Sequence, residues 1–436
     1  MRIGTIKTST FLNCGYRLDP SIHLSEGVKV RKAISELPYK LSTVGECSSS
    51  VFLGNIFSRI FVSNPERGVE YLAASDTVLE DLHTGRYLSK KQAADLSYLI
   101  LKKDWILVTC SGTLGNVSYT NANYEGKIAT HDLIRIVPSD KNVKRGVLYA
   151  FLVSKYGYYQ ITQSQFGGVV KHINSDQVKT IKIPIFPEGL QKAVNDLIQE
   201  SAHLREHATT LLDQAKEMLG NYLNIDNKSD GFKTSTVSSK KIWQSLQHRL
   251  DPPALMNNGV EAMNDIVKRM PNIVIKDIKA NVYRPGIFKR IYVADGIPYI
   301  KGSEVFLTNP FRRCEHLSRT RTPFIDEMTL YEGQILITCA GSCGNVKMIT
   351  KEYEDKSAIG SQDIIRLVSY DTLFTGEYLF VYLQQPFVYG YIQSMKYGSV
   401  IERIEPFHVE SIPVVKPTKK LSEEITAIIK KYKGRL

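Results

Sequence analysis

One sequence pattern occurs twice in this chain, and this duplication constrains the fold more than any other feature. Residues 106–117 have the sequence ILVTCSGTLGNV, and residues 335–346 have the sequence ILITCAGSCGNV. Further matches follow in the same order, at offsets between 226 and 232 residues: 7–10 with 233–236, 17–20 with 249–252, 56–62 with 287–293, 132–135 with 363–366, 166–169 with 397–400, and 183–184 with 412–413. Chance similarity would not preserve both order and spacing, so we expect two related domains.

Each copy is predicted to be a mixed α/β globule. The apolar, β-branched run at residues 106–110 predicts a buried strand, and a second strand is expected to begin at Asn116. Glycines punctuate the intervening turn and supply positive φ there; they are Gly112, Gly115, Gly341 and Gly344. Helices are predicted at residues 89–101, with Ser89 as the N-cap, at 146–163 and at 376–393.

A long heptad helix is predicted between the two copies. From 189 to 223 there is no proline, and apolar or small residues recur at alternating spacings of four and three: Leu190, Val194, Leu197, Ser201, Leu204, Ala208, Leu211, Ala215, Met218 and Tyr222. Such a helix is about 50 Å long at 1.5 Å per residue. The second copy begins the same pattern with Leu421, Ile425, Ile428 and Tyr432. We expect the two helices to pair antiparallel, although each could instead pack on its own domain.

Charge is distributed unevenly along the chain. The net charge is +12, which favours a polyanionic partner such as nucleic acid. The helix at 189–223 has three basic and five acidic residues, so its net charge is −2 and the rest of the chain carries +14. This distribution is expected if the domains contact phosphates and the helix separates them.

The sequence lacks the common signatures of catalysis and metal binding. None of the six cysteines forms a CxxC pair, and Cys339 and Cys343 flank a glycine turn without a nearby histidine. His203 and His207 share a helix face, but no third ligand is apparent. There is no GxxxxGK[ST] phosphate loop and no GxSxG motif. No apolar run reaches the ~18 residues of a membrane span. We therefore expect a non-enzymatic binding protein of the cytoplasm.

Taken in order, these segments resemble the specificity subunit of type I restriction–modification systems. In each half, a strand with SGTLGN or AGSCGN precedes FGGVVKHI or YGSVIERI, and then IKIPIFP or SIPVVKP. A heptad helix follows each half. The resemblance implies two α/β target recognition domains, at residues 1–187 and 227–416. It also implies a central spacer helix at 188–226 and a short C-terminal helix at 417–436, which form an antiparallel coiled coil.

The same resemblance implies the partners of the chain. Each domain would recognise one half of a bipartite, asymmetric double-stranded DNA target. The helices would dock adenine-N6 methyltransferase subunits, with two expected, through residues that include Leu190, Val194, Leu197, Leu204, Leu211, Met218, Leu421, Ile425 and Ile428. A motor-nuclease subunit would join for cleavage in a prokaryotic defence against phage. The chain itself would hold no cofactor or metal, because S-adenosylmethionine binds to the methyltransferase. Because the C-terminal helix is shorter than the spacer helix, the two docking surfaces are not expected to be equivalent.

Candidate DNA-contacting segments are the glycine turns and the loops just before Val169 and Val400, because loops on a rigid scaffold carry binding. In the first copy the candidate residues are Ser111, Thr113, Gln165, Lys171 and His172. In the second they are Lys301, Ser303, Ser342, Lys396, Tyr397 and Arg403. Asp132 and Asp363 recur beside Arg135 and Arg366, and we expect structural roles for them.

Two other functions remain open from the sequence. A stand-alone DNA-binding regulator with two half-site readers would bind DNA without partners, and its heptad seam would be satisfied within the chain. A nuclease concealed in one domain would cleave DNA with a divalent metal, and substitution of paired carboxylates would abolish that activity. A neighbouring adenine methyltransferase gene would favour the specificity subunit over both.

Overall fold

The computed structural model divides the chain into two compact units, Met1–Glu206 and His207–Leu436. It describes residues 5–13, 16, 18, 20–163, 165, 171–225, 238–244, 249–251, 254 and 257–436. The division falls inside helix α8 (Glu188–Leu223), which is continuous from one unit into the next. Several repeated segments, among them 166–169 and 233–236, lie outside the described residues.

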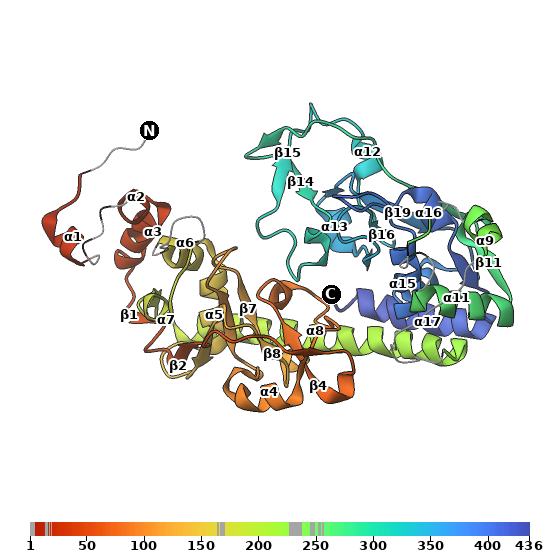
Figure 1. Ribbon diagram of the computed structural model, residues 1–436. Helices are drawn as coiled ribbons and strands as arrows, with labels where there is room; N and C mark the ends of the chain where they lie inside the picture. Colours follow the sequence, from red (N-terminus) through yellow and green to blue (C-terminus); the bar gives the residue numbers. More distant parts are fainter. Residues whose placement is uncertain are drawn as a thin grey trace. The chain divides into compact units, whose positions relative to one another are not determined.

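The first unit combines three small sheets with short helices (Figure 1). Its strands are β1 (Leu41–Thr43), β2 (Ser48–Leu53), β3 (Phe61–Val62), β4 (Gly68–Leu72), β5 (Tyr87–Ser89), β6 (Ile106–Thr109), β7 (Val117–Tyr119), β8 (Ile128–Ala129), β9 (Leu133–Pro138) and β10 (Lys182–Pro184). Its helices before α8 are α1 (Thr8–Asn13), α2 (Pro20–His23), α3 (Glu26–Ser35), α4 (Lys90–Asp95), α5 (Arg145–Val153), α6 (Lys155–Gln163) and α7 (Ser175–Lys179). The sheet orders are β2-β9-β6-β7, β3-β5-β4-β8 and β1-β10.

The second unit has the same sheet topology, strand for strand. Its orders are β12-β19-β16-β17, β13-β15-β14-β18 and β11-β20, and in both units the only parallel pairing among the described strands is that of β4 with β8 or of β14 with β18. The strands are β11 (Asn272–Val274), β12 (Ala280–Tyr283), β13 (Tyr292–Val293), β14 (Ile297–Ile300), β15 (Glu315–Leu317), β16 (Ile335–Thr338), β17 (Val346–Met348), β18 (Ile359–Gly360), β19 (Ile364–Ser369) and β20 (Pro413–Val415). The helices are α9 (Ser239–Gln244), α11 (Asn258–Arg269), α12 (Ile325–Met328), α13 (Lys351–Asp355), α14 (Gly376–Leu383), α15 (Pro386–Ser394), α16 (Pro406–Glu410) and α17 (Lys419–Lys433). The duplication predicted from the sequence is therefore a structural duplication of a mixed α/β unit.

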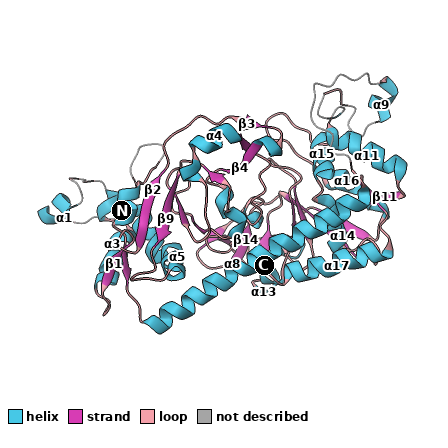
Figure 2. Ribbon diagram, turned by 90° about the horizontal axis from the view of Figure 1, so that it is seen from below, coloured by secondary structure: helices cyan, strands magenta, loops and turns pink. Residues whose placement is uncertain are grey.

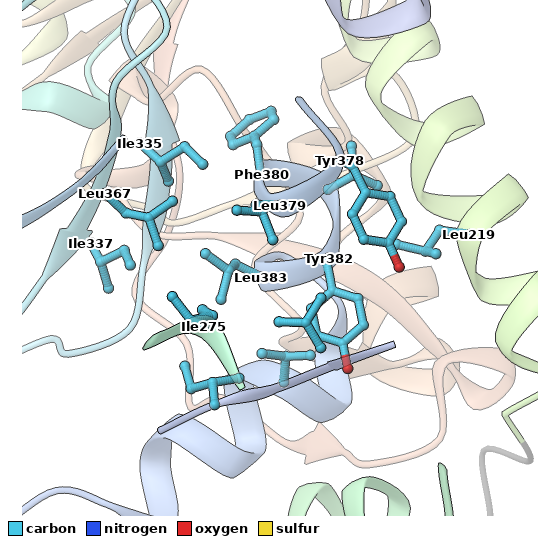
Figure 3. Packing of buried hydrophobic residues seen from close by; sticks show 14 of the residues in the cluster. Leu219, Ile275, Ile335, Ile337, Leu367, Tyr378, Leu379, Phe380, Tyr382 and Leu383 are labelled. Atoms are coloured by element: carbon cyan, nitrogen blue, oxygen red, sulfur yellow. The ribbon is translucent and has the colours of Figure 1, made fainter. Parts of the chain in front are cut away.

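The central strand of each unit is buried on both faces, which explains its uniformly apolar sequence. In β6, Ile106 and Val108 pack into one core cluster, whereas Leu107 packs into another on the opposite face. In β16, Ile335 and Ile337 face the large core of the second unit, where Leu379 and Leu383 of α14 meet them (Figure 3). The predicted buried strand and the strand after the turn are confirmed in both units.

Three predicted helices are interrupted. Ser89 does cap α4, since its side chain accepts a hydrogen bond from the Gln92 amide, but α4 ends at Asp95 and a 3-10 turn (Ser97–Leu99) follows. The helix predicted at 146–163 is two helices, because the Ser154 hydroxyl bonds the Phe151 carbonyl and the Gly157 amide between them. The helix predicted at 376–393 breaks before Pro386, which lacks the amide needed to continue it.

The long helix is confirmed, but its buried side coincides only in part with the predicted seam, with which it shares Ala208 and Ala215. In the second unit its buried residues are Ala208, Leu212, Ala215, Leu219 and Leu223, so Leu211, Met218 and Tyr222 lie at the edge of the contact. These residues share a core with Leu421, Ile425, Ile429 and Tyr432 of α17. Helix α17 runs antiparallel to this half of α8, since the Tyr222 hydroxyl near the end of α8 donates to the Lys416 carbonyl just before α17 (Figures 1 and 2).

Candidate nucleic-acid interface

A glycine turn projects from the central strand of each unit. Gly112 and Gly115 have φ of 66° and 75°, and Gly341 and Gly344 have φ of 70° and 88°, which confirms that glycine supplies the left-handed conformation. A threonine at the end of the strand holds each turn. The Thr109 hydroxyl donates to the Thr113 carbonyl and accepts from the Asn116 amide.

The same arrangement recurs in the second unit, where the Thr338 hydroxyl donates to the Ser342 carbonyl and accepts from the Asn345 amide. The exposed tips of the two turns are therefore fixed in equivalent conformations. The side chains at the tips differ, with Ser111 and Thr113 in the first unit and Ala340 and Ser342 in the second, whereas Leu114 and Cys343 are buried.

Each glycine turn lies beside the loop that follows the aromatic helices. In the first unit Ser111 pairs with His172 in an isolated antiparallel bridge, and the Ile173 amide donates to the Cys110 carbonyl. The glycine turn with Ser111 and Thr113 and the loop with Lys171 and His172 thus lie side by side, which the sequence did not predict. Gln165 precedes the part of this loop, residues 166–170, that lies outside the described residues.

In the second unit the corresponding loop is a hairpin. Tyr397 and Arg403 exchange backbone hydrogen bonds of 3.0 and 2.8 Å, Gly398 has a φ of 102°, and Val400 at the tip is 93% exposed. Ala340 pairs with Arg403, which places the predicted residues Ser342, Tyr397 and Arg403 beside the glycine turn. Lys396 is ion-paired with Glu402, so part of its charge is already balanced.

Two predicted residues lie elsewhere in the second unit. Lys301 and Ser303 follow β14 of the other four-stranded sheet. Lys301 lies 2.6 Å from the Glu315 carboxylate and 3.9 Å from that of Glu304, and the pairing with Glu315 raises its pKa. Because two carboxylates already neutralise Lys301, it is a weaker candidate for a phosphate contact than the residues of the glycine-turn region.

Arg135 and Arg366 are fully buried at matched positions and bind backbone carbonyls. Arg135 donates to the carbonyls of Leu133, Ala129 and Thr130. Arg366 donates to the carbonyls of Ser361, Ile364, Met328 and Gly360. Burial lowers the pKa of each guanidinium to about 10, so both stay charged at neutral pH. They bind carbonyls of the loops that carry Asp132 and Asp363, for which a structural role stays a prediction.

Sequence reasoning missed a second basic feature of each unit, the pair Arg59 and Arg290. Both lie in the duplicated segments 56–62 and 287–293, and both reach the loop braced by the buried arginine. The repeat could have indicated these arginines, because IFSRIFV and IFKRIYV are among its strongest matches. The isoleucines at 56 and 287 are exposed, so packing in the core does not explain why they recur.

The structure offers no cluster for a metal among the residues it describes. Burial raises the pKa of Cys110 to about 12 and that of Cys339 to about 11, so these thiols are neutral and packed rather than nucleophilic. His203 pairs with Glu206 on α8 at 3.1 Å. None of the described helices is both long and apolar enough to cross a membrane.

Comparison with known proteins identifies one part of the chain. Residues 66–199 match the family model of the type I restriction modification DNA specificity domain. For this part of the chain, the resemblance drawn from the sequence is confirmed. The matched segment contains the first glycine turn, the loop after α6 and the beginning of α8. No curated protein matches the chain.

Solved structures also show similarity at low sequence identity. The S subunit of a type I restriction–modification system from M. genitalium is 13% identical, with 92% of this chain and 91% of that chain covered and a TM-score of 0.37. The HsdS subunit from Thermoanaerobacter tengcongensis is 12% identical over 92% and 91% of the two chains, with a TM-score of 0.28.

Proposed function

We propose that this chain is the sequence-specificity subunit of a type I restriction–modification system, because residues 66–199 match the model of the type I restriction modification DNA specificity domain. Each unit recognises one half of a bipartite DNA target. The observation that carries the proposal is the duplicated glycine turn with its adjoining loop, which offers side chains of different chemistry on two equivalent scaffolds. Lys and Arg would fix the register on phosphates while a few polar side chains contact base edges.

The two halves of the target differ. In the first unit the glycine turn offers Ser111 and Thr113 beside Lys171 and His172. In the second unit Ser342 lies beside Tyr397 and Arg403. Such differences in donors, acceptors and apolar groups select different base pairs, because each base pair presents its own pattern in the major groove. The target is therefore asymmetric, with an unread spacer between its halves.

The chain works without chemistry of its own in this proposal. Adenine methylation, with S-adenosylmethionine as methyl donor, takes place in two methyltransferase subunits that dock on the helices, and a motor-nuclease subunit adds cleavage. Support comes from the outer face of α8, where Leu190 is 49% and Leu197 is 65% exposed. Exposed leucines on a regular helix are a favourable surface for a partner helix. The predicted docking residues differ in exposure: Val194, Leu204, Leu211, Met218 and Ile428 are partly buried, and Leu421 and Ile425 are fully buried within their unit.

The exposed leucines also bear on the stand-alone regulator. That alternative requires the apolar seam of the helix to be buried within the chain. In the part of the chain that the structure describes, Leu190 and Leu197 of this seam are instead exposed. The nuclease alternative is tested directly by incubating the purified chain with duplex DNA and Mg²⁺ or Mn²⁺. Cleavage that is lost on substitution of a carboxylate pair would replace the proposal.

The decisive experiment is methylation mapping. The chain is expressed with an adenine methyltransferase from the same system, and methylated positions are mapped across a genome. An asymmetric bipartite motif with a fixed gap supports the proposal, whereas one short continuous motif, or no methylation, contradicts it. A His172→Ala, Thr113→Ala double variant should then change only one half of the motif. A Ser342→Ala, Arg403→Ala double variant should change only the other half.

A further inference from the structure

Two loops outside the predicted site are unusually alike in the two units. They lead into β3 and β13, at residues 54–60 and 285–291, and they present isoleucines to solvent at equivalent places. Ile56 is 86% exposed and Ile287 is 76% exposed. A single exposed isoleucine is ordinary in a folded protein. Exposure of the same residue at the equivalent position of both units indicates a function that the two loops share.

Each loop also holds an arginine against a buried tyrosine. The Arg59 Nε donates to the Tyr71 hydroxyl at 2.6 Å, and the Arg290 Nε donates to the Tyr299 hydroxyl at 2.7 Å. The guanidinium carbons lie 5.5 and 5.7 Å from the centroids of the same rings. Both tyrosines are almost completely buried, so each guanidinium rests on a rigid support.

A second contact points each arginine toward the loop braced by the buried arginine. The Arg59 Nη2 donates to the Thr130 hydroxyl at 3.3 Å, and the Arg290 Nη2 lies 3.7 Å from the Asp363 carboxylate. A guanidinium has five N–H donors, so these contacts leave donors for a ligand. Arg59 is exposed, and the Arg290 side chain is 33% exposed.

The base of each loop is fixed as well. The Ile60 carbonyl accepts from the Ser89 amide and the Ile291 carbonyl accepts from the Ser318 amide, both at 3.0 Å. Phe57 and Phe288 pack against the apolar clusters beneath the loops. Each loop is anchored at its end and its guanidinium is already oriented. Such a loop loses little conformational entropy when it binds a ligand.

We infer that these loops, which we name the arginine loops, form a second DNA-contacting element in each unit. The inference rests on the proposed function and adds residues to it. Arg59 and Arg290 bind backbone phosphates through their free N–H donors, and Ile56 and Ile287 pack against sugars or base edges in the adjoining groove. DNA is the occupant that the charge favours, because residues 54–62 and 285–293 contain Arg59, Lys289 and Arg290 but no Asp or Glu.

The test compares substitutions that separate charge, geometry and apolar contact. The variants are R59Q/R290Q, R59K/R290K and I56S/I287S, and the control is K419Q, which removes a charge from an exposed side chain of α17. Binding of the full chain to mixed-sequence duplex DNA is measured by fluorescence anisotropy over a range of salt concentrations. Thermal unfolding of each variant reports whether the fold is retained.

The R59Q/R290Q variant should weaken binding roughly tenfold or more and lower the salt dependence by about one unit of slope for each lost phosphate contact. R59K/R290K should keep the slope, since lysine also neutralises a phosphate, but should bind more weakly than the unsubstituted chain. I56S/I287S should weaken binding without a change of slope, and K419Q should behave as the unsubstituted chain.

The outcomes distinguish the two proposals. Failure of the unsubstituted chain to bind duplex DNA, alone and with its methyltransferase, contradicts the proposed function. Normal binding by that chain and equal binding by all three loop variants overturns the arginine loops alone. The inference that the arginine loops contact DNA is also overturned if the variants bind DNA normally but no longer co-purify with the methyltransferase, because the loops then contact a protein. Should R59Q/R290Q fail to fold, R59K/R290K and I56S/I287S still decide.

Discussion

The two units share their sheets and their glycine turns, but each holds its half of α8 by different forces. In the first unit the contacts are largely polar. The Gln191 side chain accepts from the Lys144 amide, the Asn195 side chain accepts from the Gly146 amide, and the Gln199 side chain donates to the Tyr119 hydroxyl. Near the end of this half, Glu206 accepts from the Ala122 amide and pairs with Lys103.

In the second unit the contacts are largely apolar, although Gln385 and Arg269 donate to the Lys216 and Leu223 carbonyls. Ala208, Leu212, Ala215, Leu219 and Leu223 enter the main core together with residues of α11, α14 and α17. Figure 3 shows Leu219 beside Tyr378 of α14. Burial of five such side chains supplies more stabilisation than a few exchanged hydrogen bonds, because each net hydrogen bond contributes only about 1 kcal/mol. The two units therefore share their sheets and the backbone of their glycine turns, whereas the packing of α8 differs between them and leaves Leu190 and Leu197 exposed in the first half.

The largest expected effect tests whether the two units fold independently. Arg135→Ala removes a buried guanidinium together with its hydrogen bonds to three carbonyls, so the first unit should lose about 3–5 kcal/mol of stability. Arg366→Ala should do the same to the second unit. Hydrogen–deuterium exchange measures each unit separately. Faster exchange of β6 and β9 with unchanged β16 and β19 is expected for Arg135→Ala, and loss of protection in both units would contradict independence.

A pair of leucines on one helix tests the difference between the halves of α8. Leu219→Ala empties a fully buried site and should cost about 3 kcal/mol in the free energy of unfolding. Leu197→Ala should change stability by less than about 0.5 kcal/mol, because the side chain is 65% exposed. Chemical denaturation measures both. If Leu197 serves a partner, Leu197→Ala should instead reduce co-purification of the methyltransferase, and unchanged co-purification would argue against docking there.

The threonines beneath the glycine turns should show a smaller effect, equal in the two units. Thr109→Val and Thr338→Val each remove a hydroxyl that bonds one carbonyl and one amide, at a cost of about 1–2 kcal/mol. Thermal unfolding measures the cost, and methylation mapping measures the effect on recognition. Each variant should relax only its own half of the target, and an effect on both halves would contradict separate recognition.

The smallest effect is a pH dependence confined to the second unit. Burial lowers the pKa of His408, whose Nδ1 accepts from the Glu405 amide at 2.9 Å. The folded chain then binds this proton less readily than the unfolded chain, so His408 contributes stability above the ordinary pKa of 6.5 that is lost as pH falls toward the folded pKa.

The first unit provides the matched control for this titration. Gln177 occupies the equivalent capping position and bonds the Asn174 amide at 2.9 Å. His408→Gln should therefore flatten the stability of the second unit between neutral and mildly acidic pH. Thermal unfolding at a series of pH values measures it, and an unchanged pH profile would assign the dependence to another group.

Part of the candidate site was predictable from the sequence because its signals are local. The run ILVTC followed by glycines predicted a strand and a positive-φ turn, and both follow from residue chemistry within a dozen positions. The sequence predicted the loops of Ser111 and His172 as separate candidates, and it did not predict that the two residues lie side by side. Arg59 was missed altogether, since its partners Tyr71 and Thr130 are distant in the chain and nothing in the local pattern connects them.

The sequence by itself determined the duplication, the mixed α/β character of each copy, and the long helix, which was predicted at 189–223 and is observed at Glu188–Leu223. Tertiary structure decided which side of that helix is buried, because heptad spacing marks an apolar stripe but not the partner that covers it. It also decided that Arg135 and Arg366 bind carbonyls instead of the neighbouring aspartates. A buried guanidinium takes the acceptors that chain folding brings to it, and those acceptors are set by the path of the β8–β9 and β18–β19 loops.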